Sequence, residues 1–233
     1  MVLLLHYNRP LKISSKFYKP EFKLLLKTGI PLFSMIYLQS LTSTFSRVVL
    51  LSVTGVIAVG YYSPALAIIT AMNLFPTIVA QYMYPQMSYE VGKSNDKNKL
   101  WTWVWKSSFY IGLFLLPMAI IGCIIIPYFI ESFFVKYTSA IFASKLAFFS
   151  GVFSGSIIGL NVLYSLKAWK SIFFVTLFKL TLYGVLLNYF ARVMNSIDGV
   201  ATGLLVSDII FFIFGIGICY YELKLKNKSK IIA

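Results

Sequence analysis

The sequence predicts an all-α, polytopic membrane protein with about six transmembrane helices. Hydrophobic residues make up 59% of the 233 residues and charged residues only 12%, and the mean hydropathy is +0.81. Soluble domains carry about a quarter charged residues, so lipid is the expected solvent for most of this surface. Six apolar stretches have the roughly 17–25 residues that cross a hydrocarbon core. They fall near residues 29–52, 60–85, 101–127, 139–166, 169–190 and 200–221.

The positive charges sort to one side of these six stretches. Fifteen of the 21 Lys and Arg residues fall in the first tail, the second connection, the fourth connection or the last tail. Because Lys and Arg stay on the cytoplasmic side of a membrane, both chain ends are expected to be cytoplasmic. An even number of crossings agrees with this orientation. Trp101, Trp103 and Trp105 open the third stretch and are expected to anchor it in the headgroup layer.

The same pattern divides the chain into three parts. Residues 1–27 form a basic N-terminal segment, residues 28–222 a six-helix transmembrane lobe, and residues 223–233 a basic tail. The formal net charge of +14 follows from this topology, so nucleic acid is not an expected partner. The connections are short, and helices that follow one another are expected mostly to pack as antiparallel neighbours.

The first stretch carries a polar stripe at helical spacing. Its members are Gln39, Ser40, Ser43, Thr44 and Arg47. A charge within a span costs about 2.5–3.5 kcal/mol on insertion scales, so it usually faces a cavity or a partner. One interpretation is a water-filled lumen in which Arg47 attracts an anionic substrate group. The other is an arginine that reaches the outer headgroups, with the hydroxyl groups bonded to their own helix.

The second stretch repeats this pattern. Thr70, Asn73, Thr77 and Gln81 share one helical face, and Pro76 lies among them. A polar helix interrupted by proline is typical of a transporter cavity wall. A polar contact between two helices, worth about 1 kcal/mol or less per hydrogen bond, would leave the same pattern.

Small residues recur in the fourth stretch. Gly151, Gly155 and Gly159 are four residues apart. This register lets two helices approach closely, so the three glycines are expected to form a helix-packing face.

Two charges fall deep in the last two stretches. Lys179 and Asp208 lie at similar depth in consecutive helices. A buried ion pair between them is the first hypothesis. The second is that Asp208 binds a proton or cation and couples transport to an ion gradient.

No catalytic constellation is recognisable in the sequence. It has no glycine-rich phosphate loop, no nucleophile elbow and no clustered pair of acids. His6 is the single histidine, and Cys123 and Cys219 fall near opposite ends of their stretches. We therefore expect no enzyme activity, no metal site, no cofactor and no disulfide.

Several short segments resemble a known transporter family. They are residues 27–32 and Arg47 in the first stretch, residues 59–65 at the start of the second, and residues 84–87 and 90–93 at its end. In order and spacing, these segments are similar to the C-terminal half of an O-antigen flippase (Wzx type), a polysaccharide transporter of the multidrug/oligosaccharidyl-lipid/polysaccharide exporter superfamily. Phe45 and Ser46 stand where that family usually has an acidic residue before the arginine.

The resemblance implies a fold, a substrate and a location. The fold is one lobe of a two-lobe MATE-like transporter in a bacterial inner membrane. The substrate is an undecaprenyl-pyrophosphate-linked oligosaccharide, flipped for surface polysaccharide or O-antigen synthesis. The implied partners are this lipid-linked oligosaccharide, membrane lipid, and an N-terminal lobe or polysaccharide assembly proteins.

Two other functions fit the same hydropathy pattern. The first is a cation-coupled multidrug exporter of the same superfamily, for which further buried carboxylates besides that of Asp208 are expected. The second is a non-transporting membrane assembly subunit, which needs no polar lumen.

Overall fold

The computed structural model describes residues 18–93 and 97–225, except for some side chains of the first helix and those at positions 97 and 225. Apart from short turns, these residues are helical. The elements are α2 (Lys19–Thr54), α3 (Val56–Tyr61), α4 (Ser63–Lys93), α5 (Lys97–Phe133), η1 (Val135–Ala140), α6 (Ile141–Ser156), η2 (Ile157–Leu160), α7 (Asn161–Ser165), α8 (Trp169–Met194), α9 (Ile197–Tyr220) and the π-helical η3 (Tyr221–Leu225). The predicted all-α class is confirmed.

Among the described residues, five helical segments are long and apolar enough to cross a membrane. They are Val56–Lys93, Asn98–Phe133, Val135–Ser165, Trp169–Met194 and Ile197–Lys224. The chain is therefore a multi-pass membrane protein. The first expected stretch lies within the continuous helix α2, whose described residues give a shorter apolar segment, Thr44–Thr54. The sixth crossing stays a prediction.

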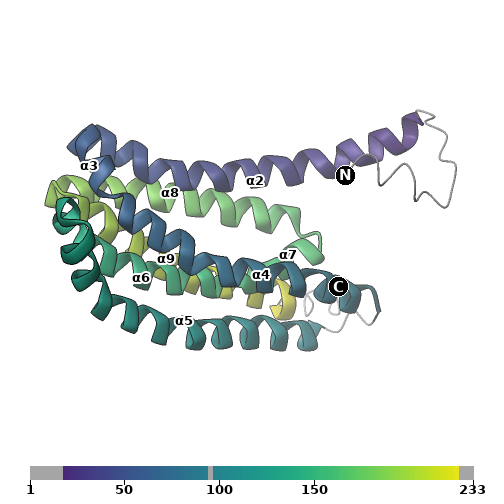
Figure 1. Ribbon diagram of the computed structural model, residues 1–233. Coiled ribbons are helices and arrows are strands. Elements are labelled where there is room, and N and C mark those ends of the chain that lie inside the picture. Colours follow the sequence, from purple (N-terminus) through teal and green to yellow (C-terminus); the bar gives the residue numbers. More distant parts are fainter. Residues whose placement is uncertain (1–17, 94–96, 226–233) are drawn as a thin grey trace, which may run out of the picture.

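The long helices run side by side, and their basic connections gather at one end of the bundle (Figure 1). We call this end the basic end. The described lysines of its connections and of η3 are Lys93, Lys99, Lys167, Lys170 and Lys224, and α2 begins at this end with Lys19, Lys23 and Lys27. Here α4 and α5 are joined by an ion pair, with Lys99 Nζ 2.8 Å from Glu90 Oε2. The opposite end holds α3, η1 and the turn between α8 and α9 (Figure 1).

Residues with unusual backbone angles or capping side chains explain two of the turns. Gly55, at φ 85°, joins α2 to α3, and Asn195, at φ 43°, ends α8. Glycine and asparagine tolerate this left-handed region better than other residues. Ser196 then caps α9, because its hydroxyl oxygen accepts a hydrogen bond from the Gly199 backbone nitrogen at 3.3 Å.

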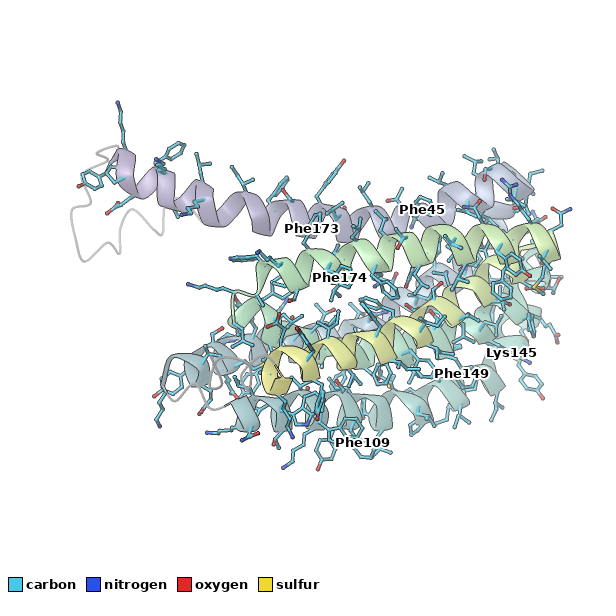
Figure 2. All side chains as sticks on the ribbon, turned by 180° about the vertical axis from the view of Figure 1, so that it is seen from behind. Phe45, Phe109, Lys145, Phe149, Phe173 and Phe174 are labelled. Atoms are coloured by element: carbon cyan, nitrogen blue, oxygen red, sulfur yellow. The ribbon has the colours of Figure 1, made fainter. Side chains whose placement is uncertain are left out.

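The packing order differs in part from the order along the chain. α5 with α6 and α8 with α9 pack as the expected neighbours. α2 instead packs against α8, where Phe45 lies over Gly184 (Figure 2), and α4 packs mainly against α6. The expectation was wrong for α2 with α4, for α4 with α5 and for α6 with α8, which contact each other little. α3 separates α2 from α4 at the end of the bundle, and α4 and α5 both pack on α6 instead.

The fourth expected stretch is not one helix. α6 follows the 3-10 turn η1 and ends at Ser156, where a second 3-10 turn, η2, leads into α7. Ser156 Oγ donates to the Val152 carbonyl at 2.6 Å, and such back-bonding weakens the helical ladder. The tighter turn η2 thus separates α6 from α7, between Gly155 and Asn161.

α6 lies at the centre of the bundle and contacts α4, α5 and α9. A Cβ at Gly151 would lie 2.5 Å from Met72 Cβ of α4, and one at Gly155 would lie 2.8 Å from Leu115 Cδ1 of α5. At Gly159 in η2, a Cβ would lie 2.7 Å from Val104 Cγ1. All three glycines therefore stand where another helix approaches too closely for a side chain.

Replacing Gly151 with alanine is expected to destabilise the bundle. The new Cβ would overlap Met72 next to its backbone, and overpacking of this kind costs about 1–3 kcal/mol. Gly217→Ala is the matched control, because no atom lies within 4 Å of its added Cβ. Thermal unfolding in detergent, followed by circular dichroism, should give a lower midpoint for G151A only; equal midpoints would refute the close contact.

Candidate functional site

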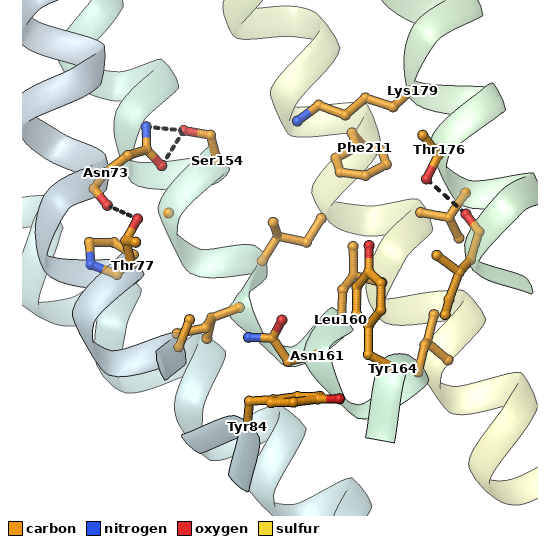
Figure 3. A pocket seen from close by; sticks show the side chains of 18 residues that line it. Asn73, Thr77, Tyr84, Ser154, Leu160, Asn161, Tyr164, Thr176, Lys179 and Phe211 are labelled. Carbon is orange, nitrogen blue, oxygen red and sulfur yellow. Dashed lines mark hydrogen bonds between the residues drawn. The ribbon is translucent and has the colours of Figure 1, made fainter. Parts of the chain in front are cut away.

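An open cavity of about 660 Å³ lies between α4 and α8, with α6, η2, α7 and α9 behind it (Figure 3). Its volume falls in the range of about 300–1,000 Å³ that is usual for small-molecule sites. The polar or aromatic side chains that line it are Asn73, Thr77, Tyr84, Ser154, Asn161, Tyr164, Thr176, Lys179 and Phe211.

A reciprocal hydrogen bond joins the α4 wall to α6. Asn73 Nδ2 donates to Ser154 Oγ at 3.1 Å, and the Ser154 hydroxyl lies 3.3 Å from Asn73 Oδ1 (Figure 3). Asn73 Nδ2 also donates to the Ile69 carbonyl at 2.8 Å. These contacts fix the amide at the cavity surface and leave acceptor capacity on its oxygen.

Other hydroxyl groups of the wall donate to their own helices. Thr77 Oγ1 donates to the Asn73 carbonyl at 2.7 Å, and Thr176 Oγ1 donates to the Ile172 carbonyl at 2.9 Å. A hydroxyl that donates its hydrogen in this way keeps lone pairs that accept from a ligand. The wall therefore offers acceptors along about 16 Å of α4, the length from Asn73 to Tyr84 at 1.5 Å per residue.

Lys179 supplies the only charge among the described residues that line the cavity. Its Nζ lies 4.8 Å from the Phe211 ring centre and 5.3 Å from that of Tyr183. Aromatic faces attract a cation at these distances. The ammonium group extends from α8 into the space that faces α4 (Figure 3). Within the described lining there is no carboxylate to neutralise it.

Behind Lys179 lies a second polar group, centred on Asp208 of α9. Asp208 is 2% exposed, and it accepts hydrogen bonds from the hydroxyl groups of Ser150 in α6 and Tyr183 in α8. Three helices are thus tied together at one carboxylate. Among the described residues no contact within 4.0 Å joins Lys179 to Asp208, but the two charges attract each other over a longer distance. Tyr183 contacts both instead, through its ring and its hydroxyl.

The sequence-predicted lumen residues fall in different places. Asn73 and Thr77 line the cavity, whereas Thr70 and Gln81 are exposed outside it. At 3.6 residues per turn, Gln81 lies about 80° around α4 from Asn73, while Tyr84 lies only about 20° away. Its spacing of three full turns from Asn73 is the sequence signal for Tyr84, which was not among the predicted lumen residues.

The described side chains of the α2 stripe are not among the residues that line this cavity. The side chains of Ser40, Thr44 and Arg47 are exposed. Ser40 donates to the Tyr37 carbonyl at 2.8 Å and Thr44 to the Ser40 carbonyl at 3.3 Å. The side chains of Gln39 and Ser43 lie outside the described part of the chain. A role of Arg47 in a lumen therefore stays a prediction that concerns the exposed face of α2.

A family model described as "Polysaccharide biosynthesis protein" matches residues 1–142, which is more than half of the chain. The chain belongs to this family. No curated protein and no solved structure matches it. The match to the polysaccharide biosynthesis family ends as α6 begins, so it contains the α4 wall of the cavity but not Lys179.

The cavity wall beyond this match was not predicted from the sequence. Ser154, Asn161 and Thr176 were not assigned to a lumen, and Lys179 was assigned only to an ion pair or coupling site. Asn161 begins α7 directly after η2. Asn161 reaches the cavity because the helix is interrupted at η2. The apolar sequence Ile157–Leu160 does not reveal that interruption.

Tyr183→Phe is expected to weaken the bundle by removing one donor to Asp208. Hydrogen bonds to charged groups contribute about 1.5–3 kcal/mol, so the free energy of unfolding should fall by about that amount. Tyr189→Phe is the matched control on the same helix, because Tyr189 is 60% exposed. Equal unfolding free energies for the two variants in detergent titrations would contradict the assignment of this hydrogen bond.

Proposed function

We propose that this member of the polysaccharide biosynthesis family is one lobe of a flippase for lipid-linked oligosaccharides, of the Wzx type. The observation that carries the proposal is the cavity between α4 and α8, which combines one cation, Lys179, with amide and hydroxyl groups. No covalent step is assigned to the chain, because moving such a lipid across the membrane requires binding and reorientation only.

The proposed substrate suits each part of the cavity. The pyrophosphate of the lipid carries negative charge and lies beside Lys179. The attraction between these charges is stronger in a partly dry site than in water. Sugar hydroxyl groups pair with Asn73 on the α4 side and with Ser154 and Asn161 at the back of the cavity. The prenyl chain stays in the lipid.

The proposed partner is a second lobe that closes the open side of the cavity. α2 and α4 are consecutive long helices, yet α2 packs on α8 and leaves the cavity between α8 and α4 open. A polar wall of this kind would be costly against acyl chains. An N-terminal lobe, as in the two-lobe family, is the occupant we propose, and rocking of one lobe against the other would give alternating access. Polysaccharide assembly proteins are the second class of partner.

The proposed location is the bacterial inner membrane with the basic end in the cytoplasm. The described lysines of that end and the tails beyond the described residues supply the charge asymmetry that sets such an orientation. Lys179 lies about 15 Å along α8 from its start at Trp169, at 1.5 Å per residue. The cavity would then reach from the cytoplasmic side to the middle of the bilayer.

The cavity chemistry favours this function over the two rivals. A multidrug exporter for cationic substrates needs a carboxylate in its cavity, and the described lining offers only a cation. A non-transporting assembly subunit needs no polar cavity. Ion coupling by Asp208 is a weaker proposal, since both of its oxygens already accept hydrogen bonds from Ser150 and Tyr183.

Lys179→Gln is expected to weaken binding of the pyrophosphate headgroup. Native mass spectrometry of the full chain with undecaprenyl pyrophosphate should give at least a tenfold loss of affinity, about 1.4 kcal/mol. Lys170→Gln, at the exposed start of the same helix, is the control and should bind as the unmodified chain does. Equal affinity of K179Q and K170Q would remove the basis of the proposal.

The chain by itself is expected not to flip lipids, because one lobe cannot enclose the cavity on both sides. Reconstitution into vesicles with a fluorescent lipid-linked sugar should give no protein-dependent translocation, and flipping by this polypeptide alone would contradict the one-lobe proposal.

In a complete two-lobe transporter, Arg47→Ala should lower surface polysaccharide if the α2 stripe faces the lumen. An assembly subunit would be insensitive to that change.

A further inference from the structure

α4 has a second concave surface on the side that faces away from the cavity. A groove of about 400 Å³ runs between α4 and α5 and is lined chiefly by Phe75, Met83, Trp103, Lys106, Tyr110 and Phe114. Phe75 is two residues from Asn73, which places it about 200° around the helix. α4 therefore separates this groove, here called the α4–α5 groove, from the cavity.

The groove exists because α4 and α5 both pack on α6 and contact each other little. Two rings tilted against each other close one end, where the Phe75 and Phe114 ring centres are 4.5 Å apart. Trp103 and Lys106 lie at the other end, near the start of α5 and hence toward the basic end of the bundle. The distance between the two ends is about 16 Å at 1.5 Å per residue along α5. An alkyl chain lying along the helices fits these dimensions.

The charge in the described lining of the α4–α5 groove is positive only. Lys106 is exposed, and no acidic residue is among the described residues that line the groove. Lys99, by contrast, is paired with Glu90. A similar apolar groove of about 390 Å³ near the opposite end, beside Pro64 and Ile130, has no charged residue in its described lining.

We propose that the α4–α5 groove binds an anionic phospholipid of the surrounding bilayer. One acyl chain lies on Phe75, Met83 and Phe114, and the phosphate lies at Lys106. Trp103 marks the headgroup layer one helical turn away, and a lysine stem reaches that layer from inside the span. A lipid in this position supports α4 from behind while the other face of α4 forms the cavity wall.

Fluorescence quenching in bilayer nanodiscs tests this lipid site. Trp103 is kept as the single tryptophan of the full chain by the substitutions W101F, W105F and W169F. Phosphatidylglycerol and phosphatidylcholine with brominated acyl chains are compared at equal mole fraction. A lysine near the headgroups contributes about 1 kcal/mol toward anionic lipid, so brominated phosphatidylglycerol should occupy the groove about fivefold more often.

Two lysine variants give the control. K106Q should reduce the preference to about one, and K170Q, outside the groove, should keep it. Equal quenching by the two lipids, or an unchanged preference in K106Q, would overturn the proposal. Weak quenching by both lipids would also overturn it, because it would mean that protein covers the groove.

A second measurement serves if the tryptophan variants fail to fold. Native mass spectrometry of the chain with all four tryptophans should show more bound phosphatidylglycerol than phosphatidylcholine, and K106Q should remove the excess. An excess that persists in K106Q contradicts the site. Neither outcome depends on the pyrophosphate cavity, so this proposal and the proposed function fail separately.

Discussion

The close approach of α6 to its neighbours is the contact on which the rest of the bundle depends. Helices in lipid gain no hydrophobic driving force from packing together, so their association relies on van der Waals contact and hydrogen bonds. Gly151 and Gly155 supply the first, since a Cβ at either position would overlap α4 or α5. Ser150 and Ser154, on the same helix, supply the second by bonding to Asp208 and Asn73. One helix thus both packs the bundle and fixes its polar groups.

This arrangement puts the two internal charges in different surroundings. Asp208 is in the closed core, where hydroxyl groups of two other helices compensate the cost of its burial. Lys179 borders the open cavity, with the Tyr183 and Phe211 rings beside it and the carboxylate of Asp208 farther away. A cation held in this way has unused hydrogen-bond donors and attracts an anion strongly. Tyr183 links the two, so the position of Lys179 depends on the hydrogen bonds of Asp208.

The features predictable from the sequence are those that depend on composition and local spacing. The apolar stretches predicted the helical membrane class, and four-residue spacing placed Gly151, Gly155 and Gly159 on one packing face. The partners of α2 were not predictable, since an apolar helix face fits α8 as well as α4. Hydropathy also merged α6, η2 and α7 into one span, because the residues of η2 are as apolar as the helices on either side. The polar wall beyond η2, with Asn161, was consequently missed.

The curvature of α4 determines the shape of the polar cavity. Its two faces border two different surfaces, the polar cavity at Asn73 and the apolar groove at Phe75. Pro76 and Pro85 lie inside the helix, and each removes a backbone hydrogen bond. A helix weakened at two points bends at lower cost than an uninterrupted one. Pro76 is itself buried against Gly155 of α6, so any bend there changes the distance between Asn73 and Ser154. The Asn73–Ser154 hydrogen bond between α4 and α6 and the packing of these two helices therefore depend on the same few residues.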